Sequence, residues 1–156
     1  MNSIDELLAI KAIERTKARY CRFLDTKNWT AWGMLFTADA TLDVSEDAAP
    51  GQHLAQGRMN IVEFVRKSVA DARTAHQVHA PEIEFQSPTS ARVIWAMHDY
   101  LTWPQDGLRP VADMHTLQGF GHYHETYRKE VDGKWYIASI HLTRTMVEMR
   151  GESGYP

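Results

Sequence analysis

Asp25 and His76 lie far apart in the sequence, and together they have the residue types that acid–base chemistry needs. The spacing predicts that Asp25 lies at the C-terminal end of a long first helix, where the helix dipole disfavours an anion by ~0.3–1 kcal/mol. Asp25 follows Phe23 and Leu24, so we expect its carboxylate to be partly buried and to need a specific partner. The alternative is a surface aspartate that opens the turn at residues 26–28, a role that suits Asp.

His76 is a candidate general base. An imidazole is the one unperturbed side chain that titrates near neutrality, so it can accept and return a proton within one turnover. A carboxylate on its other ring nitrogen would fix the tautomer and stabilise the imidazolium. His79 lies three residues further on, and alternation along a strand puts it on the opposite face. We therefore expect only one of these two histidines to enter a pocket.

Three further residues could take part in chemistry, and each also has a plain structural interpretation. His98 shares a strand face with Ile94 and Ala96, so it is either a second catalytic histidine or a hydrogen-bonded core or interface histidine. Tyr20 is either a phenol donor or a packing residue on the apolar stripe of the first helix. Arg144 has apolar neighbours and could bind a carboxylate or a coenzyme A phosphate, or it could face solvent on an edge strand.

The sequence does not predict a metal centre. His122 and His124 alternate along one strand and point to the same face, but no fixed third ligand is evident. Cys21 lies four residues before Asp25 on the same side of the helix and is expected to pack rather than to act as a nucleophile. We therefore expect neither a metal nor another cofactor.

Composition limits the remaining possibilities. The 156 residues suffice for one domain, and a net charge of −3 gives no electrostatic attraction for nucleic acid or an anionic membrane. A single cysteine excludes an intramolecular disulfide and suits a reducing compartment. The start of the chain is acidic and polar, unlike a signal peptide, and no apolar stretch approaches the ~20 residues of a membrane span. These features predict a soluble, cytoplasmic protein with one domain over residues 1–156 and a tail from about residue 148.

Hydrophobic periodicity predicts helices first and long antiparallel strands afterwards, the order of an α+β domain. A capping box at Ser3 and Glu6 begins an amphipathic helix of about 20 residues. Asn28 is expected to cap a short second helix, and residues 45–57 are expected to form a loop. The sequence at 131–134 predicts a type I′ hairpin turn, because Asp-Gly readily supplies positive φ angles. Further elements are a short strand at 40–44, a third helix at about 61–69, and strands at 74–85, 91–103, 114–130 and 134–147.

Local motifs carry a resemblance to the SnoaL-like branch of the nuclear transport factor 2-like superfamily. They are the segment 19–25 with Trp29, the segment 76–83 and the segment 132–137. The resemblance implies a cone-shaped α+β barrel, in which a strongly bent, mostly antiparallel sheet curls around a long N-terminal helix. Within this branch the chain looks most like the bile acid 7α-dehydratase type, and more distantly like scytalone dehydratase. It departs from the former where a family tyrosine is replaced by Val44, which puts a steroid substrate in doubt.

The resemblance also implies roles for the candidate residues. In the resembling dehydratases the residue aligned with Asp25 pairs with a histidine, which here corresponds to His76. A tyrosine is found at the position of Tyr20, an arginine at that of Arg144, and scytalone dehydratase has a second catalytic histidine near His98. A cofactor-independent lyase is therefore expected, most simply a dehydratase that acts on a hydrophobic alicyclic or aromatic molecule. An isomerase or polyketide cyclase with the same His–Asp pair, or a ligand-binding module without chemistry, remains open.

The expected pocket is largely apolar. Its candidate substrate-binding residues are Arg144, Trp29, Phe36, Phe120 and Tyr123. One strand carries two apolar faces, Val93, Trp95 and Met97 on one side and Ile94, Ala96 and His98 on the other, and both cannot line one pocket. One face is expected to meet another copy of the chain, which predicts a homodimer or homotrimer.

Overall fold

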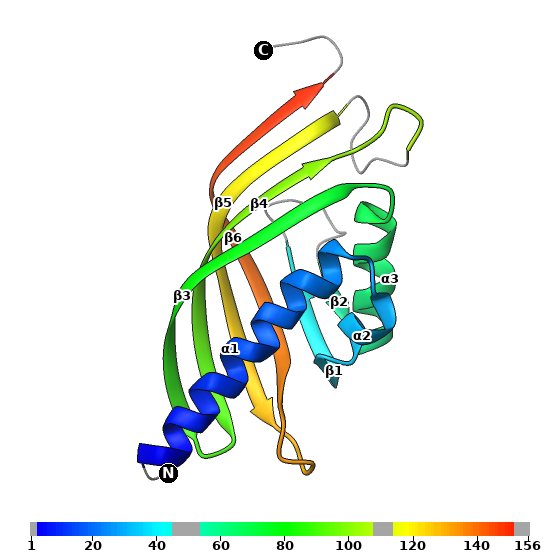
Figure 1. The fold of residues 1–156 in the computed structure, drawn as a ribbon. Helices are drawn as coiled ribbons and strands as arrows, with labels where there is room; N and C mark the ends of the chain where they lie inside the picture. Colours follow the sequence, from blue (N-terminus) through cyan, green and yellow to red (C-terminus); the bar gives the residue numbers. More distant parts are fainter. Residues whose placement is uncertain (1–2, 45–53, 108–113, 152–156) are drawn as a thin grey trace.

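The computed structural model describes residues 3–44, 54–107 and 114–151, which form three helices and one six-stranded sheet (Figure 1). The helices are α1 (Ser3–Asp25), α2 (Trp29–Gly33) and α3 (Arg58–Val69). The strands are β1 (Phe36–Asp43), β2 (Leu54–Gln56), β3 (Arg73–Ser87), β4 (Ser90–Thr102), β5 (Met114–Lys129) and β6 (Trp135–Gly151).

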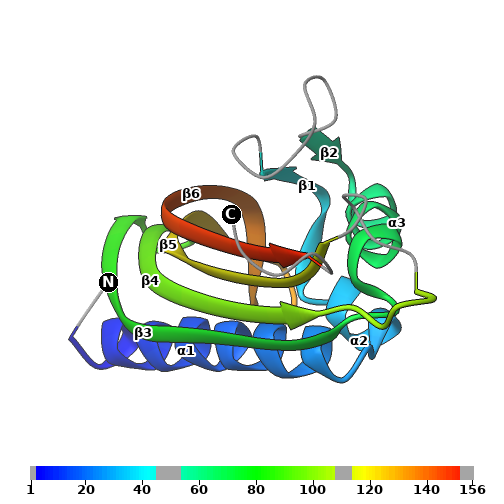
Figure 2. The ribbon, with the colours of Figure 1, turned by 90° about the horizontal axis from the view of Figure 1, so that it is seen from above.

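Helix α1 is amphipathic, and its apolar stripe packs against the sheet. Its buried residues recur three or four positions apart, as one helix face requires: Ala9, Ile13, Thr16, Lys17, Tyr20, Cys21 and Leu24. The Thr16 hydroxyl reaches the Trp135 carbonyl of β6 at 3.1 Å, which ties the middle of the helix to the sheet. Seen from above, α1 runs along the sheet beside β3, while α2 and α3 gather at one end (Figure 2).

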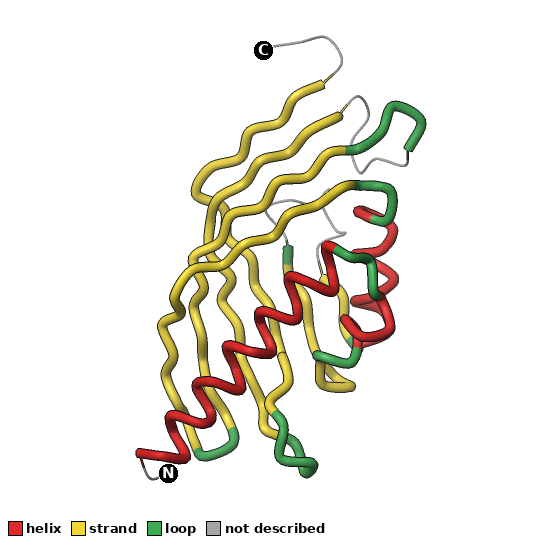
Figure 3. Tube along the Cα trace, in the orientation of Figure 1, coloured by secondary structure: helices red, strands yellow, loops and turns green. Residues whose placement is uncertain are grey.

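The sheet has the strand order β2-β1-β6-β5-β4-β3. Strands β1 and β6 are parallel, and every other neighbouring pair is antiparallel. One extra residue in β3 lies between Val78, which pairs with Met97, and Pro81, which pairs with Trp95. This bulge is in an edge strand, where a proline without an N–H group is tolerated, and such bulges increase the local bend of a strand. The long strands bend together along their length (Figure 3).

The predicted fold class is confirmed: the chain is an α+β cone with a long N-terminal helix and a curled, mostly antiparallel sheet. Asn28 caps α2, as predicted, and its side-chain oxygen accepts a hydrogen bond from the Ala31 N–H at 3.2 Å. Two local predictions need correction. The predicted loop at 45–57 ends in strand β2, which pairs with β1, and residues 45–53 lie outside the described residues. Strand β6 continues to Gly151, where a tail from about residue 148 was expected.

The β5–β6 hairpin also differs from the prediction. Gly133 has a φ of 78°, but Asp132 does not share the positive φ that a type I′ turn requires. Instead the Gly133 N–H donates to the Glu130 carbonyl at 2.9 Å, and the Glu130 N–H donates to the Lys134 carbonyl at 3.0 Å. This pattern is a three-residue loop in which a turn is followed by one left-handed glycine.

The two faces of the sheet have different surroundings. Side chains of β4 and β5 alternate between buried and more exposed positions. The buried Tyr123 and Glu125 of β5 contact Tyr20 and Lys17 of α1, so the buried set lies on the face that carries the helix. We call the face that packs on α1 the inner face and the opposite one the outer face. In the part of the chain that the structure describes, no helix is long and apolar enough to cross a membrane.

Candidate active site

The end of helix α1 positions Asp25, which is its last residue. The Asn28 N–H donates to the Phe23 carbonyl at 2.9 Å, and the Lys27 N–H donates to the Leu24 carbonyl at 3.1 Å. This is the Schellman pattern of helix termination, in which the residue after the cap adopts a left-handed conformation. That residue is Lys27, with a φ of 57°, where glycine is the usual choice. The turn reverses the chain and leaves the Asp25 side chain directed at strand β3.

Strand β3 supplies three hydrogen bonds to the Asp25 carboxylate. Nδ1 of His76 lies 2.6 Å from Oδ1, the Thr74 hydroxyl donates to the same oxygen at 2.8 Å, and the backbone N–H of His76 donates to Oδ2 at 3.0 Å. Nζ of Lys27 in turn donates to the Thr74 hydroxyl at 2.9 Å. The predicted contact between Asp25 and His76 is therefore present, and we call these two residues the dyad.

The electrostatics of the dyad determine which nitrogen of His76 is available. Burial raises the pKa of Asp25. The hydrogen bond and charge of the His76 side chain, together with the hydrogen bonds from the His76 backbone and Thr74, lower the pKa by more than burial raises it, so the net pKa is below the ordinary value. The carboxylate is thus ionised near neutral pH and accepts the Nδ1 proton. Among the described residues Nε2 of His76 has no hydrogen-bond partner. The imidazole side chain is only 7% exposed and that of Asp25 is 24% exposed.

Next to the dyad, the inner face carries a buried ion pair that the sequence did not predict. Asp99 of β4 lies directly opposite His76 of β3 in the antiparallel register. The two terminal nitrogens of Arg144 contact the two carboxylate oxygens of Asp99 at 2.9 and 2.8 Å. Arg144 therefore faces the inner side, as one of its two interpretations required, but its guanidinium is bound by the protein's own carboxylate.

Tyr20 and Tyr123 form a second buried group on the inner face. Their ring centroids are 6.1 Å apart, and Nζ of Lys17 lies over both rings, 4.1 and 3.7 Å from the respective centroids. That ammonium group also contacts Glu125 at 2.5 Å, and both charged side chains are fully buried. Burial, followed by nearby negative charge or a second phenol, raises the pKa of both tyrosines well above the ordinary value. Both phenols therefore remain protonated hydrogen-bond donors.

Comparison with known proteins identifies the family to which this arrangement belongs. Residues 5–141 match the SnoaL-like domain. The chain belongs to the SnoaL-like family, within the nuclear transport factor 2-like superfamily. A protein of Gibberella zeae named "Probable cyclase FGR4" is 26% identical over 144 residues, which cover 87% of this chain and 91% of its own length.

Solved structures share the fold of this SnoaL-like domain at low sequence identity. The "Putative Scytalone Dehydratase" of Novosphingobium aromaticivorans is 23% identical and has a TM-score of 0.75, covering 98% of this chain and 95% of its own. A type 2 hexachlorocyclohexane dehydrochlorinase is 13% identical and has a TM-score of 0.79, with coverages of 99% and 97%. The narrower likeness to bile acid 7α-dehydratase stays a prediction.

Two of the predicted site residues lie on the outer face of the SnoaL-like domain. His98 adjoins inward-facing Asp99, and Phe120 lies between Gly119 and Gly121, which both face inward, so alternation turns His98 and Phe120 outward. Their rings stack on each other with centroids 4.4 Å apart. Phe120 was expected to line the pocket, and that prediction is corrected because the residue lies across the sheet from the dyad. Of the two interpretations of His98, the structure favours a hydrogen-bonded histidine outside the pocket, since its Nε2 lies 3.1 Å from the Gln118 side-chain nitrogen.

The other predicted residues divide between the core, the site and the surface. Phe36 is fully buried and packs edge-on against Trp32 with centroids 4.9 Å apart, so it is a core residue. Trp29 is partly buried, and its ring lies 6.0 Å from Nζ of Lys27, beside the dyad. His79 is exposed, as expected if only one histidine of its pair turns inward.

His122 and His124 lie on the outer face with ring centroids 6.3 Å apart, and the His141 ring of β6 is 5.9 Å from that of His124. Burial, followed by the charges of these two neighbours, lowers the pKa of His124. Within the described ranges, no group of three or more His, Cys, Asp or Glu side chains is arranged to hold a metal ion.

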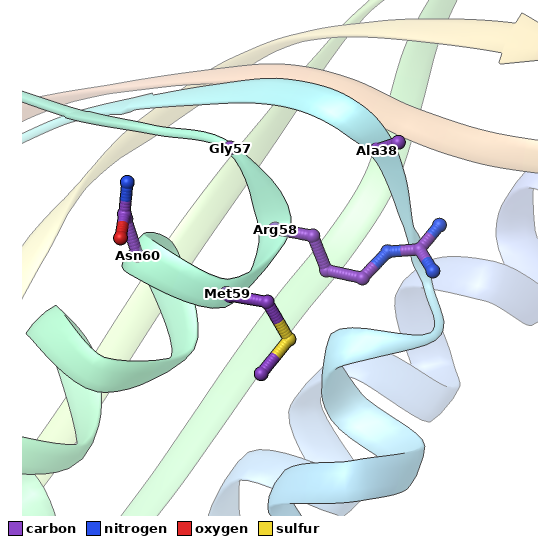
Figure 4. Close-up of a pocket in the computed structure, with 5 residues that line it drawn as sticks. All are labelled: Ala38, Gly57, Arg58, Met59 and Asn60. Carbon is purple, nitrogen blue, oxygen red and sulfur yellow. The ribbon is translucent and has the colours of Figure 1, made fainter.

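Two surface cavities lie away from the dyad. One, of about 300 Å³, lies at the start of α3 and is lined by Ala38, Gly57, Arg58, Met59 and Asn60 (Figure 4). The Arg58 guanidinium beside it donates two hydrogen bonds to the Phe36 carbonyl, at 3.0 and 2.5 Å. The other cavity, of about 490 Å³, includes Glu82, Arg92, Ile94 and His124. Neither is lined by Asp25 or His76, so the candidate active site is defined by its side chains rather than by either cavity.

Proposed function

We propose that this SnoaL-like domain is a cofactor-independent lyase, specifically a dehydratase that acts on a hydrophobic alicyclic or aromatic small molecule. The observation that carries the proposal is the 2.6 Å contact between Nδ1 of His76 and the Asp25 carboxylate on the inner face. This contact commits one ring nitrogen to Asp25 and leaves Nε2 to exchange a proton. The SnoaL-like family match and the dehydratase and dehydrochlorinase fold relatives support the reaction class.

In the proposed reaction Nε2 of His76 removes a proton from the carbon next to a carbonyl group, or from its vinylogous equivalent. The carbon–oxygen bond to the leaving hydroxyl then breaks, a carbon–carbon double bond forms, and His76 returns the proton so that water leaves. Asp25 stabilises the imidazolium formed between these steps. Tyr20, whose phenol remains protonated, is proposed to donate a hydrogen bond to the developing enolate.

NMR spectra recorded in D₂O test the proposal without knowledge of the natural substrate, because they detect both the loss of water and the exchange of hydrogen for deuterium. Cyclic β-hydroxyketones, beginning with 3-hydroxycyclohexanone, are incubated with the protein in D₂O and followed by NMR. Dehydration gives vinyl signals, and His76→Gln should reduce their rate by roughly 10²–10⁴-fold while the variant stays folded. An unchanged rate in folded His76→Gln would refute the role of His76.

A second function has a specific observation in its favour. The relative from Gibberella zeae is named as a cyclase and matches most of this chain, so the same dyad could serve enolisation without loss of water. The same experiment separates the two reactions. An isomerase or cyclase would exchange the α-hydrogen for deuterium without producing vinyl signals, and this exchange would also depend on His76.

We also propose that the chain forms a homodimer or homotrimer through its outer face and acts in the cytoplasm without a nucleic-acid or membrane partner. Val93, Trp95 and Met97 turn inward and are at most 3% exposed, so the opposite set, Ile94, Ala96 and His98, is the one available to another copy. A sedimentation coefficient of a monomer at micromolar concentration would contradict the proposed assembly.

A further inference from the structure

The guanidinium of Arg144 is held in a complete two-point contact by Asp99. Nη1 lies 2.9 Å from Oδ1 and Nη2 lies 2.8 Å from Oδ2, and the side chains are 8% and 4% exposed. This parallel arrangement is the one through which arginine binds a free carboxylate or phosphate. The protein's own carboxylate thus occupies the Nη1–Nη2 edge of the guanidinium, one of the edges through which an arginine binds an anion.

The fold provides the space for this contact. A Cβ atom added to Gly119 would lie 2.3 Å from Nη1 of Arg144 and 2.6 Å from Oδ1 of Asp99. Both distances are far below van der Waals contact, so any larger residue at position 119 would displace the ion pair. The absence of a side chain on β5 therefore allows Arg144 of β6 to reach Asp99 of β4.

The pair lies beside the dyad. Asp99 is the cross-strand neighbour of His76, and side chains in such positions have Cβ atoms roughly 4.5–5.5 Å apart. An anionic group brought to His76 would meet the carboxylates of Asp25 and Asp99. Both nearby cations already have partners: Arg144 contacts the Asp99 carboxylate, and Lys27 donates a hydrogen bond to the hydroxyl of Thr74, which in turn donates to Asp25.

We propose that Asp99 determines the specificity of the site: by occupying Arg144, it makes the site select uncharged ligands over carboxylates and phosphates. Within the proposed function this names the substrate class as a neutral ketone or alcohol rather than an acid. A buried anion without a partner is unfavourable, whereas a neutral ligand of the same shape avoids that cost.

A matched pair of probes tests the proposal by binding alone. Benzoate and methyl benzoate differ in charge but share the ring, and each is titrated into the protein at pH 7.5 with ligand-observed NMR. The native chain should bind the ester more tightly than the anion. Asp99→Asn should remove the carboxylate from the Nη1–Nη2 edge of Arg144 and strengthen benzoate binding about 10- to 100-fold, the range expected of a charge-assisted hydrogen bond, with little change for the ester.

Thermal unfolding keeps the test decisive if Asp99→Asn is destabilised. Benzoate should then raise the unfolding temperature of this variant more than methyl benzoate does, because a ligand that binds only the folded state stabilises it. The matched control is the double variant Asp99→Asn/Arg144→Gln, which lacks both charges and should not gain affinity for benzoate.

A benzoate-to-ester preference that is the same in the native chain and in Asp99→Asn would overturn the proposal, as would a native chain that prefers benzoate. Because turnover is not measured, the result does not depend on His76 as a base. His76→Gln should keep the preference for the ester even though it should lose activity, so failure of the proposed reaction is distinguishable from failure of the specificity inference.

Discussion

Replacing Lys17 by Met should be among the most destabilising single changes in the chain. Its ammonium group is fully buried and contacts Glu125 at 2.5 Å, while the other carboxylate oxygen of Glu125 accepts a hydrogen bond from Tyr127 at 2.7 Å. Methionine has a similar length but no charge, so the variant leaves the Glu125 carboxylate buried without its counter-ion. Breaking a buried pair in this way costs about 3–5 kcal/mol.

The pair lies under the phenols of the inner face, so the expected loss includes their contacts. The ammonium lies 4.1 Å from the Tyr20 ring centroid and 3.7 Å from that of Tyr123. For a domain of this length, 1 kcal/mol shifts the unfolding temperature by about 2–4 °C, so Lys17→Met should unfold about 6–20 °C below the native chain. Urea unfolding followed by far-ultraviolet circular dichroism measures the same loss as a free energy.

The double variant Lys17→Met/Glu125→Gln is the matched control. The amide oxygen that Glu125→Gln introduces can still accept the Tyr127 hydrogen bond, and no uncompensated charge remains. The double variant should therefore be no less stable than either single variant. Two single losses of less than about 1 kcal/mol, or a double loss equal to their sum, would refute the assignment of a coupled buried ion pair.

Three further variants test the site and its frame. Because hydrogen bonds outweigh burial and lower the pKa of Asp25, the free energy of unfolding should fall as pH drops below about 5. Asp25→Asn should flatten this dependence in urea titrations from pH 6 to 3. The same change of unfolding free energy with pH in both chains would contradict the lowered pKa. Lys27→Gly should cost little stability, because glycine adopts the left-handed conformation of residue 27 without strain. It should slow the reaction of the dyad, because the hydrogen bond from Nζ to Thr74 is lost. A variant as active as the native chain would show that Lys27 does not contribute to the site. Gly121→Ala should destabilise by more than about 3 kcal/mol, since its Cβ would lie 2.0 Å from the Thr143 carbonyl oxygen, and near-native urea unfolding would count against this close strand approach.

Strand alternation predicted much of the inner face. It separated Val93, Trp95 and Met97 from the opposite set, and Asp99 continues the same inward series. The inward position of Asp99 was therefore available from the sequence, but its partner was not, because only the pairing of β5 with β6 and the glycine at position 119 bring Arg144 to it. The same alternation, followed strictly from Asp99, turns His98 outward, which favours a hydrogen-bonded interface histidine over a second catalytic histidine, the alternative taken from the resemblance.

Contacts between distant segments account for what the sequence did not predict. Lys17 falls between Ile13 and Tyr20 on the apolar stripe of α1, but 108 residues separate it from Glu125, and no local pattern relates the two. The Asp25–His76 contact was expected only through the family resemblance, since 51 residues separate the pair. Helix periodicity placed Asp25 at the end of α1, and the Schellman turn at Lys27, which the sequence did not predict, directs it toward β3.

The tautomer of His76 tests the central claim most directly. The chain has eight histidines, and the His76 signals can be assigned by their loss in His76→Gln in a ¹⁵N NMR spectrum of the ring nitrogens at pH 7.5. If Asp25 prepares His76 as a base, Nδ1 carries the proton and Nε2 is unprotonated in the native chain, and this preference is lost in Asp25→Asn. A native spectrum with the proton on Nε2, or one that Asp25→Asn leaves unchanged, would contradict the proposed dyad.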